Sequence, residues 1–189
     1  PDPDTLMGKF NVRGAHLTME QAEKLDVEFH KTGSLIVGFD EKDARVIKKK
    51  YENGLLMGVQ GMKILNGDEV REREPNLSPD ITIALWVPES GVINPWEFTL
   101  AHAEVAVREG VELKLNEEDR GIEQKEDHYL IHTQDADYEA KFVVNCAGTH
   151  SDEIHNMVAK PAFKVEATRG QYYILDRAVG ELVKSVIFP

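Results

Sequence analysis

The stretch from Lys141 to Cys146 (KFVVNC) constrains the fold more than any other part of the chain, because it is nearly all apolar. Such a run is typical of a strand that is covered on both faces, as in a parallel sheet flanked by helices. Ala147 and Gly148 follow it directly, and residues 150–158 then have a helical pattern. We therefore expect a layered α/β fold in which this strand passes into a helix.

The rest of the sequence alternates between predicted helices and strands. Three polar residues, Asp40, Asn66 and Asn94, stand where helix caps are expected. Asn94 is the clearest, because Pro95 takes the first helical position and Glu97 completes a capping-box pattern, and Gly110 is expected to end this helix. Hydrophobic periodicity predicts helices over residues 6–25, 41–55, 67–74, 95–109 and 150–158. Apolar or alternating runs predict strands over residues 33–39, 62–65, 81–87, 111–115, 121–124, 129–133 and 141–146, and an extended segment over 163–175.

The order of these elements indicates two interleaved domains. The helix from Pro95 feeds a strand at Val111, and together with the apolar strand at 141–146 this suits a parallel layer. The flanking segments, residues 33–92 and 163 onward, suit an antiparallel sheet with helices on one face. We therefore assign residues 1–28 and 94–161 to one domain, and residues 29–93 and 162–189 to the other.

Charge and cysteine content exclude several classes of function. The net charge is −12, from 34 acidic and 22 basic residues, so the surface repels phosphate backbones and we expect no nucleic-acid partner. An anionic substrate then needs a locally placed Arg or Lys. Cys146 is the only cysteine, which excludes an internal disulfide and a cysteine-built metal site, and we expect no metal.

The sequence also predicts where the chain resides and how it relates to a longer protein. No apolar run approaches the roughly 20 residues that span a bilayer, and no signal peptide is visible, so we expect a cytoplasmic protein without a transmembrane segment. The chain opens at Pro1 without a methionine and closes on the apolar run Ser185–Pro189. We expect it to be an internal piece of a larger protein.

Two features are candidate binding elements, and each also has a plainer interpretation. Small residues at Ala147 and Gly148, between a strand and a helix, allow a ligand to approach the backbone, but they equally suit an ordinary turn. Arg169 lies beside Gly170 and Tyr172, where it suits a bidentate grip on an anion. The alternative is an exposed strand arginine paired with a glutamate.

An ordered set of segments resembles the FAD-dependent glycerol-3-phosphate dehydrogenase group of the D-amino-acid-oxidase-like flavoproteins. The segments are PDPDTLMGKFNVRG at the start, GSLIVGF at 33–39, EPNL at 74–77, PESGVINPWEF at 88–98, VVNCAGTHSDEI at 143–154 and TRGQYYIL at 168–175. The resemblance implies an incomplete Rossmann-like FAD domain (residues 1–28 and 94–161) and a mixed, largely antiparallel substrate-domain sheet with helices (residues 29–93 and 162–189).

The resemblance also implies roles for individual residues. Asn145, Ala147 and Gly148 are expected near FAD, and Asp119 stands on the adenine side, where relatives tend to carry Val. Arg169, Gly170 and Tyr172 are expected to bind a small anionic substrate. No general base is identified.

The resemblance implies an FAD-dependent dehydrogenase that oxidises sn-glycerol 3-phosphate and passes electrons to a quinone or an electron-transfer subunit. A 2-hydroxy-acid oxidase or dehydrogenase of the L-2-hydroxyglutarate type and an inert flavoprotein-like assembly module are the alternatives. The GxGxxG loop of the group is missing from the 189 residues. The chain alone is therefore expected to be inactive and not to retain FAD.

Overall fold

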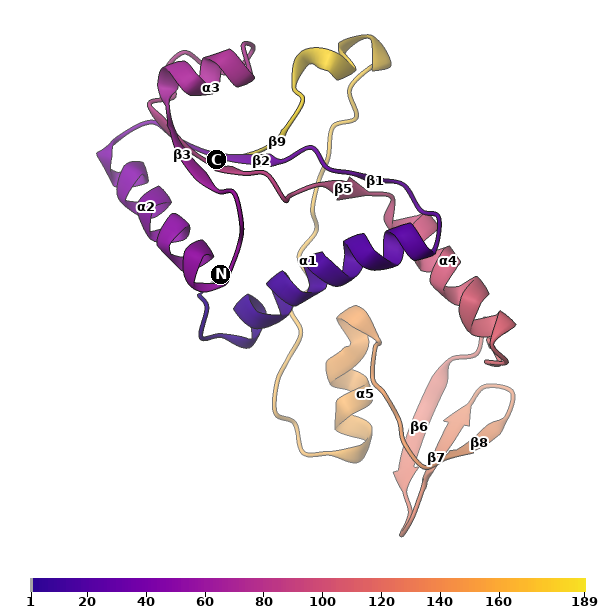
Figure 1. Ribbon diagram of the computed structural model, residues 1–189. Helices are drawn as coiled ribbons and strands as arrows, with labels where there is room; N and C mark the ends of the chain where they lie inside the picture. The colour runs from indigo at the N-terminus through magenta and orange to yellow at the C-terminus, as the bar shows by residue number, and fades with distance from the viewer. Residues whose placement is uncertain (1) are drawn as a thin grey trace. The chain divides into compact units, whose positions relative to one another are not determined.

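The computed structural model describes residues 2–189, and these form two compact units. The first unit takes in the residues up to Val111 together with Leu175–Pro189, and the second is Glu112–Ile174. Figure 1 shows the elements of both units. In the described residues, no helix is long and apolar enough to cross a bilayer.

A four-stranded mixed sheet forms the centre of the first unit. Its strands are β2 (Ser34–Gly38), β3 (Lys63–Asn66), β4 (Ile83–Val87) and β9 (Val186–Phe188), in the order β3-β4-β2-β9. The pairs β3–β4 and β2–β4 are antiparallel, with Leu35 opposite Trp86, whereas β9 runs parallel to β2 with Ser34 opposite Val186. The apolar run at the end of the sequence is thus a paired strand.

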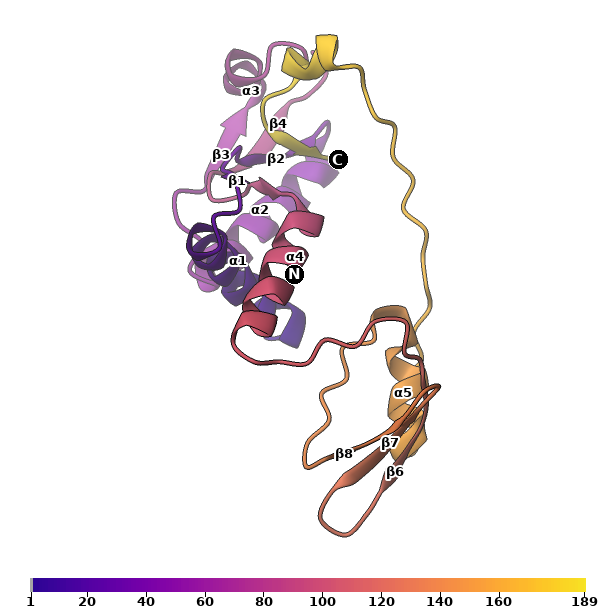
Figure 2. The ribbon, with the colours of Figure 1, turned by 90° about the vertical axis from the view of Figure 1, so that its right-hand side faces the viewer.

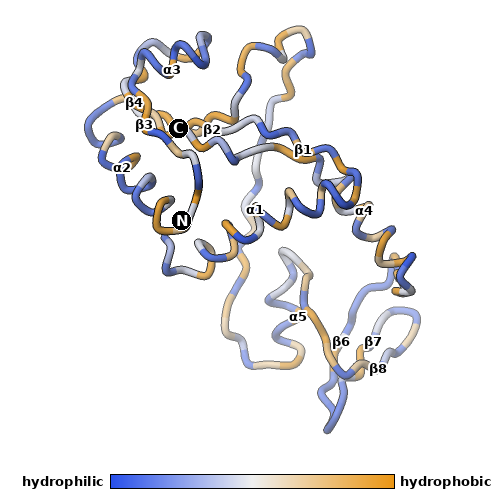
Figure 3. The backbone as a smooth tube through the Cα atoms, viewed as in Figure 1, coloured by the Kyte–Doolittle hydropathy of each residue, from blue (hydrophilic) through white to orange (hydrophobic). Residues whose placement is uncertain are grey.

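Helices cover both faces of this sheet. Helix α2 (Glu41–Leu56) places Ile47 against Leu85 on one face, and α3 (Gly67–Arg73) places Val70 against Leu35 and Val37 on the other. The alternating side chains of β2 supply both cores, as expected for a strand with period two. Figure 3 shows the hydrophobic residues gathered in these strands.

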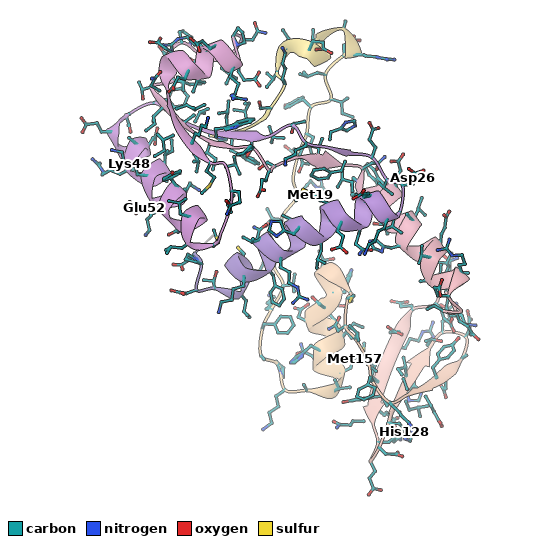
Figure 4. All side chains as sticks on the ribbon, viewed as in Figure 1. Met19, Asp26, Lys48, Glu52, His128 and Met157 are labelled. Carbon is teal, nitrogen blue, oxygen red and sulfur yellow. The ribbon has the colours of Figure 1, made fainter. Side chains whose placement is uncertain are left out.

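The remaining elements of the first unit are two helices and a short ribbon. Helix α1 (Leu6–Lys24) starts at Thr5, whose side chain accepts a hydrogen bond from the Gly8 amide, and α4 (Pro95–Arg108) starts at Asn94. Strands β1 (Phe29–His30) and β5 (Val92–Ile93) pair antiparallel. Figure 4 labels Met19 on α1, Asp26 just beyond its end, and the exposed pair Lys48 and Glu52 on α2.

The second unit is an antiparallel meander with one helix. Strands β6 (Asp119–Gln124), β7 (Tyr129–Thr133) and β8 (Asp137–Ala140) pair in the order β6-β7-β8, and α5 (Ser151–Val158) packs against β6 (Figure 2). A register shift separates Asp119 from Gly121 on β6. A short 3-10 turn, Gly148–His150, leads into α5, and another, Arg177–Leu182, precedes β9 in the first unit.

Several predicted strands are absent from the described residues. Residues 141–146 and 111–115 form no strand, so the predicted parallel layer does not form, and no strand forms within 163–175. Phe142 and Val144 are 87% and 82% exposed, because no strand of the described residues pairs with 141–146. A strand needs partner strands as well as an apolar sequence, and 141–146 has only the sequence.

The mixed α/β class is confirmed, including the mixed sheet with helices. The assignment of 1–28 and 94–161 to an FAD domain, and of 29–93 and 162–189 to a substrate domain, stays a prediction. It follows the order of the predicted elements and the family resemblance, whereas the two units above are defined by packing.

Candidate functional site

The carboxamide of Asn145 shapes the bend that leads into α5. Its Oδ1 accepts a hydrogen bond from the Ala147 amide at 3.2 Å, and its Nδ2 donates to the Ser151 carbonyl at 2.7 Å. Ser151 Oγ donates to the Gly148 carbonyl at 2.6 Å. An asparagine that bonds to the backbone two residues on is a standard turn former, so the sequence folds locally at this point.

Gly148 has the backbone conformation that a side chain disfavours. Its φ is +56°, and no described atom lies within 4 Å of the place where a Cβ would stand. The backbone is exposed on this side, so a flat or charged ligand can come close to the peptide groups of Ala147 and Gly148. The backbone of the bend is therefore open to an approaching ligand.

Asn145 also lines a small cavity between the meander and α5. The cavity has a volume of about 200 Å³, and its other walls are Ile122, Tyr129, Val143, Ile154, His155 and Val158. It is too small for a cofactor-sized molecule, since ligand pockets usually measure about 300–1,000 Å³. The cavity thus reports loose packing around the 143–145 run.

Asp119 lies at a different place in the same unit. It is exposed at the start of β6 and lines a polar pocket of about 380 Å³ with Glu112, Lys114, Glu117, Thr133 and Tyr138. Glu117 Oε1 accepts hydrogen bonds from Tyr138 Oη at 2.7 Å and from Thr133 Oγ1 at 2.8 Å. These bonds lower the pKa of Glu117, and the one from Tyr138 contributes most.

The predicted substrate residues lie in an extended segment without secondary structure. Arg169, Gly170 and Tyr172 are exposed, Tyr172 to 90%, and among the described residues the Arg169 side chain makes no ion pair or hydrogen bond. The Tyr172 ring folds back toward Gly170, where a Cβ would stand 3.3 Å from the ring. These residues are neighbours in sequence, but no pocket brings them together with Asn145, Gly148 or Asp119.

Two contacts in this unit were not anticipated from the sequence. Asp152 Oδ2 accepts a hydrogen bond from the Val165 amide at 3.0 Å, which lowers the pKa of Asp152 and ties the extended segment to α5. The other is the Glu117 cluster, whose partners lie 16 and 21 residues away. Neither contact has a signal in local spacing.

Comparison with known proteins decides the family. The family model described as "DAO: FAD dependent oxidoreductase" matches residues 2–189, nearly the whole chain. The chain belongs to this family of FAD-dependent oxidoreductases. The family resemblance inferred from the sequence is thereby confirmed.

Individual relatives refine the comparison. The chain is 44% identical over 186 residues to a glycerol 3-phosphate dehydrogenase of Caloramator mitchellensis. The alignment covers 98% of this chain and 39% of the relative. It is 26% identical over 189 residues to the L-2-hydroxyglutarate dehydrogenase of Escherichia coli K12, covering 99% of this chain and 44% of that protein. The chain therefore spans about two-fifths of the length of the curated relatives it matches.

Solved structures show the same fold. L-alpha-glycerophosphate oxidase from Mycoplasma pneumoniae, with FAD bound, superposes with a TM-score of 0.78 at 24% identity, over 84% of this chain and 43% of that one. Glycine oxidase from Geobacillus kaustophilus superposes with a TM-score of 0.74 at 19% identity. The match covers 83% of this chain and 44% of that one.

The residues at the 145–148 bend fit a flavin cofactor. The open space at Gly148 and the fixed turn at Asn145 allow a ligand to contact the backbone. FAD dependence comes from the family.

Proposed function

We propose that the whole protein carrying this chain oxidises sn-glycerol 3-phosphate to dihydroxyacetone phosphate. The observation that carries the proposal is the 44% identity, along 98% of this chain, to a relative named glycerol 3-phosphate dehydrogenase. Relatives named L-2-hydroxyglutarate dehydrogenase reach 25–27% over a similar share of this chain. Identity that is distributed along the whole chain favours a shared substrate over a shared fold alone.

The reaction removes a hydride from the carbinol carbon and a proton from its hydroxyl group, which leaves the ketone. FAD supplies the hydride acceptor for such an oxidation. We propose a quinone or an electron-transfer subunit as the final electron acceptor.

We propose that the 145–148 bend holds the cofactor through its backbone. Asn145 fixes the turn by bonding to Ala147 and Ser151, while the positive φ of Gly148 keeps the approach open. Asp119 is proposed on the adenine side through its backbone, because a backbone contact does not depend on the Asp that stands where relatives tend to carry Val.

We propose that Arg169 binds the anionic end of the substrate, with Gly170 and Tyr172 beside it. Arg169 has no acidic partner among the described residues, so its guanidinium is free to bind an external anion. In a chain of net charge −12, a dianion needs such a local cation. A planar guanidinium forms two parallel hydrogen bonds to a phosphate or carboxylate.

A 2-hydroxy acid is the second candidate substrate, because the L-2-hydroxyglutarate dehydrogenases match 99% of this chain. A dye-reduction assay on the FAD-loaded whole protein separates the two candidates. We expect turnover with sn-glycerol 3-phosphate and little with L-2-hydroxyglutarate. The reverse order of kcat/KM would overturn the proposal, and no turnover with any hydroxy substrate would favour an inert assembly module.

A further inference from the structure

Helix α1 carries a basic stripe in an otherwise acidic chain. Lys9, Arg13 and His16 follow one another at spacings of four and three residues, so their side chains share one face of the helix. All three residues are exposed, and among residues 2–189 neither the Lys9 nor the Arg13 side chain forms an ion pair or a hydrogen bond. Like charges one turn apart destabilise a helix slightly, so the helix itself gains nothing from this arrangement.

The stripe lines a pocket within the first unit. The pocket has a volume of about 530 Å³, which is in the range of small-molecule sites. Lys9 and Arg13 supply its positive charge beside His16, and Glu20 is the one acidic residue among its described lining residues. The Glu20 carboxylate already binds Lys24 at 2.6 Å, which lowers its pKa. Positive charge therefore dominates the pocket.

The opposite wall of the pocket is apolar. Leu56 and Met57, at the end of α2, line the pocket across from α1, and Val12 and Leu17 add apolar surface on α1 itself. Leu56 is 76% exposed, so a ligand that covers it removes apolar surface from water.

A second, largely apolar cavity continues from the first. It measures about 540 Å³, shares Val12, His16 and Met57 with the first pocket, and extends to Ile36, Val87 and Phe188 at the sheet. A ligand with a charged end and an apolar body has complementary surroundings along this path.

We infer that this cleft is a binding site for a small organic anion, a phosphate or carboxylate with an apolar body. Arg13 and Lys9 hold the anionic group, and the body lies against Leu56 and Met57. The site involves none of the residues assigned above to the cofactor or the substrate, and the inference does not depend on which substrate the enzyme oxidises.

Calorimetric titration of the 189-residue chain tests this site with two matched pairs of probes. Phenyl phosphate and benzoate carry an apolar body, whereas inorganic phosphate and acetate do not. We expect saturable one-to-one binding of at least one of the first two, with the bare anion weaker by about tenfold or more. The preferred probe shows whether the site suits phosphate or carboxylate.

Two double variants identify where the probe binds. Lys9→Gln with Arg13→Gln should weaken binding by about a hundredfold, because two charge-assisted contacts are lost. Arg45→Gln with Lys49→Gln is the matched control, since these residues have the same charges and spacing on the exposed side of α2 and line none of the pockets described here. Arg13→Lys keeps the charge but loses the planar fork, so it should fall between the wild type and the double variant.

Circular dichroism checks that each variant keeps its helix content. If no organic anion shows saturable binding, or if the control pair weakens binding as much as the α1 pair, the site does not exist. If the α1 pair unfolds the chain, Arg13→Lys alone decides: unchanged affinity contradicts the proposal, and reduced affinity supports it.

Discussion

The buried carboxylate of Glu74 accepts three hydrogen bonds from Lys184 and Ser185, more than a hundred residues further along the chain. Glu74 is 1% exposed. Its Oε1 accepts from the Ser185 amide at 2.8 Å and from Ser185 Oγ at 2.6 Å, and its Oε2 accepts from the Lys184 amide at 3.1 Å. Glu74 thus joins the end of α3 to the start of β9 and fixes the strand that pairs with β2.

Glu74→Ala should lower the free energy of unfolding by about 2–4 kcal/mol, because two backbone amides lose their buried partner. Unfolding of the chain in urea, monitored by circular dichroism, measures this change in the free energy of unfolding. Glu72→Ala, on the exposed side of the same helix, serves as the control and should change stability by less than about 0.5 kcal/mol. Equal effects of the two substitutions would show that the Glu74 contacts contribute little.

The stability of the second unit should depend on pH through the protonation of His132. Its Nδ1 lies 2.8 Å from Asp137 and its Nε2 lies 3.2 Å from Glu123, and the hydrogen bond to Asp137 is the main cause of its raised pKa. A pKa that is raised on folding favours the imidazolium, so this contribution to stability is full below the unfolded pKa of about 6.5 and is lost as the pH rises through the folded value.

An NMR titration of the imidazole protons measures the pKa of His132 directly. Asp137→Asn should bring the value back toward that of an unfolded chain. A His132 pKa at or below the ordinary value would contradict the geometry.

Gly148→Ala should lower the FAD content of the whole protein. A side chain at φ +56° costs about 1–2 kcal/mol and fills the open side of the bend. Gly110→Ala is a matched control, because Gly110 also has a positive φ and open space around it but ends helix α4. Both variants should lose similar stability, and only Gly148→Ala should lose flavin absorbance. Equal FAD content in the two variants would remove Gly148 from the cofactor site.

Arg169→Ala in the whole protein should raise KM for the anionic substrate about ten- to a hundredfold, the loss of one charge-assisted contact. Arg169→Lys should restore only part of the substrate affinity, since an ammonium group cannot form the two parallel hydrogen bonds of a guanidinium. Arg177→Ala, an exposed arginine nearby in sequence, is the control, and FAD content should stay constant throughout. An unchanged KM and kcat for Arg169→Ala would leave Arg169 an ordinary surface residue.

The 189-residue chain alone should be colourless after dialysis. It contains no GxGxxG loop to bind a pyrophosphate at a helix N-terminus. Absorbance spectra before and after incubation with FAD test this, with free FAD dialysed in parallel. Stoichiometric flavin that survives dialysis would show that these 189 residues bind FAD without the loop, which contradicts the prediction.

The sequence predicted those parts of the fold that depend on neighbouring residues. Asp40, Asn66 and Asn94 each cap the helix expected of them, because a cap is formed by amides two or three residues away. Gly110 likewise ends α4 with a positive φ. At Asn94, the side chain accepts from the Trp96 and Glu97 amides, which is half of the predicted capping box. The complete box forms at Asn66, whose amide donates to the Glu69 side chain at 2.8 Å.

Features that depend on distant residues were not predictable in this way. The run around Val143 has the composition of a buried strand, yet it forms no strand here, because pairing requires partners that no local pattern specifies. The Glu74 contact with Ser185 and the Glu117 contact with Tyr138 are also long-range. Of the candidate site, the turn at Asn145 and Gly148 follows from local chemistry, whereas the surroundings of Arg169 do not.

Anaerobic reduction of the bound flavin tests the central claim most directly. The FAD-loaded whole protein is mixed with sn-glycerol 3-phosphate, or with the same compound deuterated at C2, and the visible flavin absorbance is followed in a stopped-flow instrument. We expect full bleaching, slowed by deuterium, with dihydroxyacetone phosphate as the product. A flavin that stays oxidised with sn-glycerol 3-phosphate but is bleached by L-2-hydroxyglutarate would contradict the proposed function.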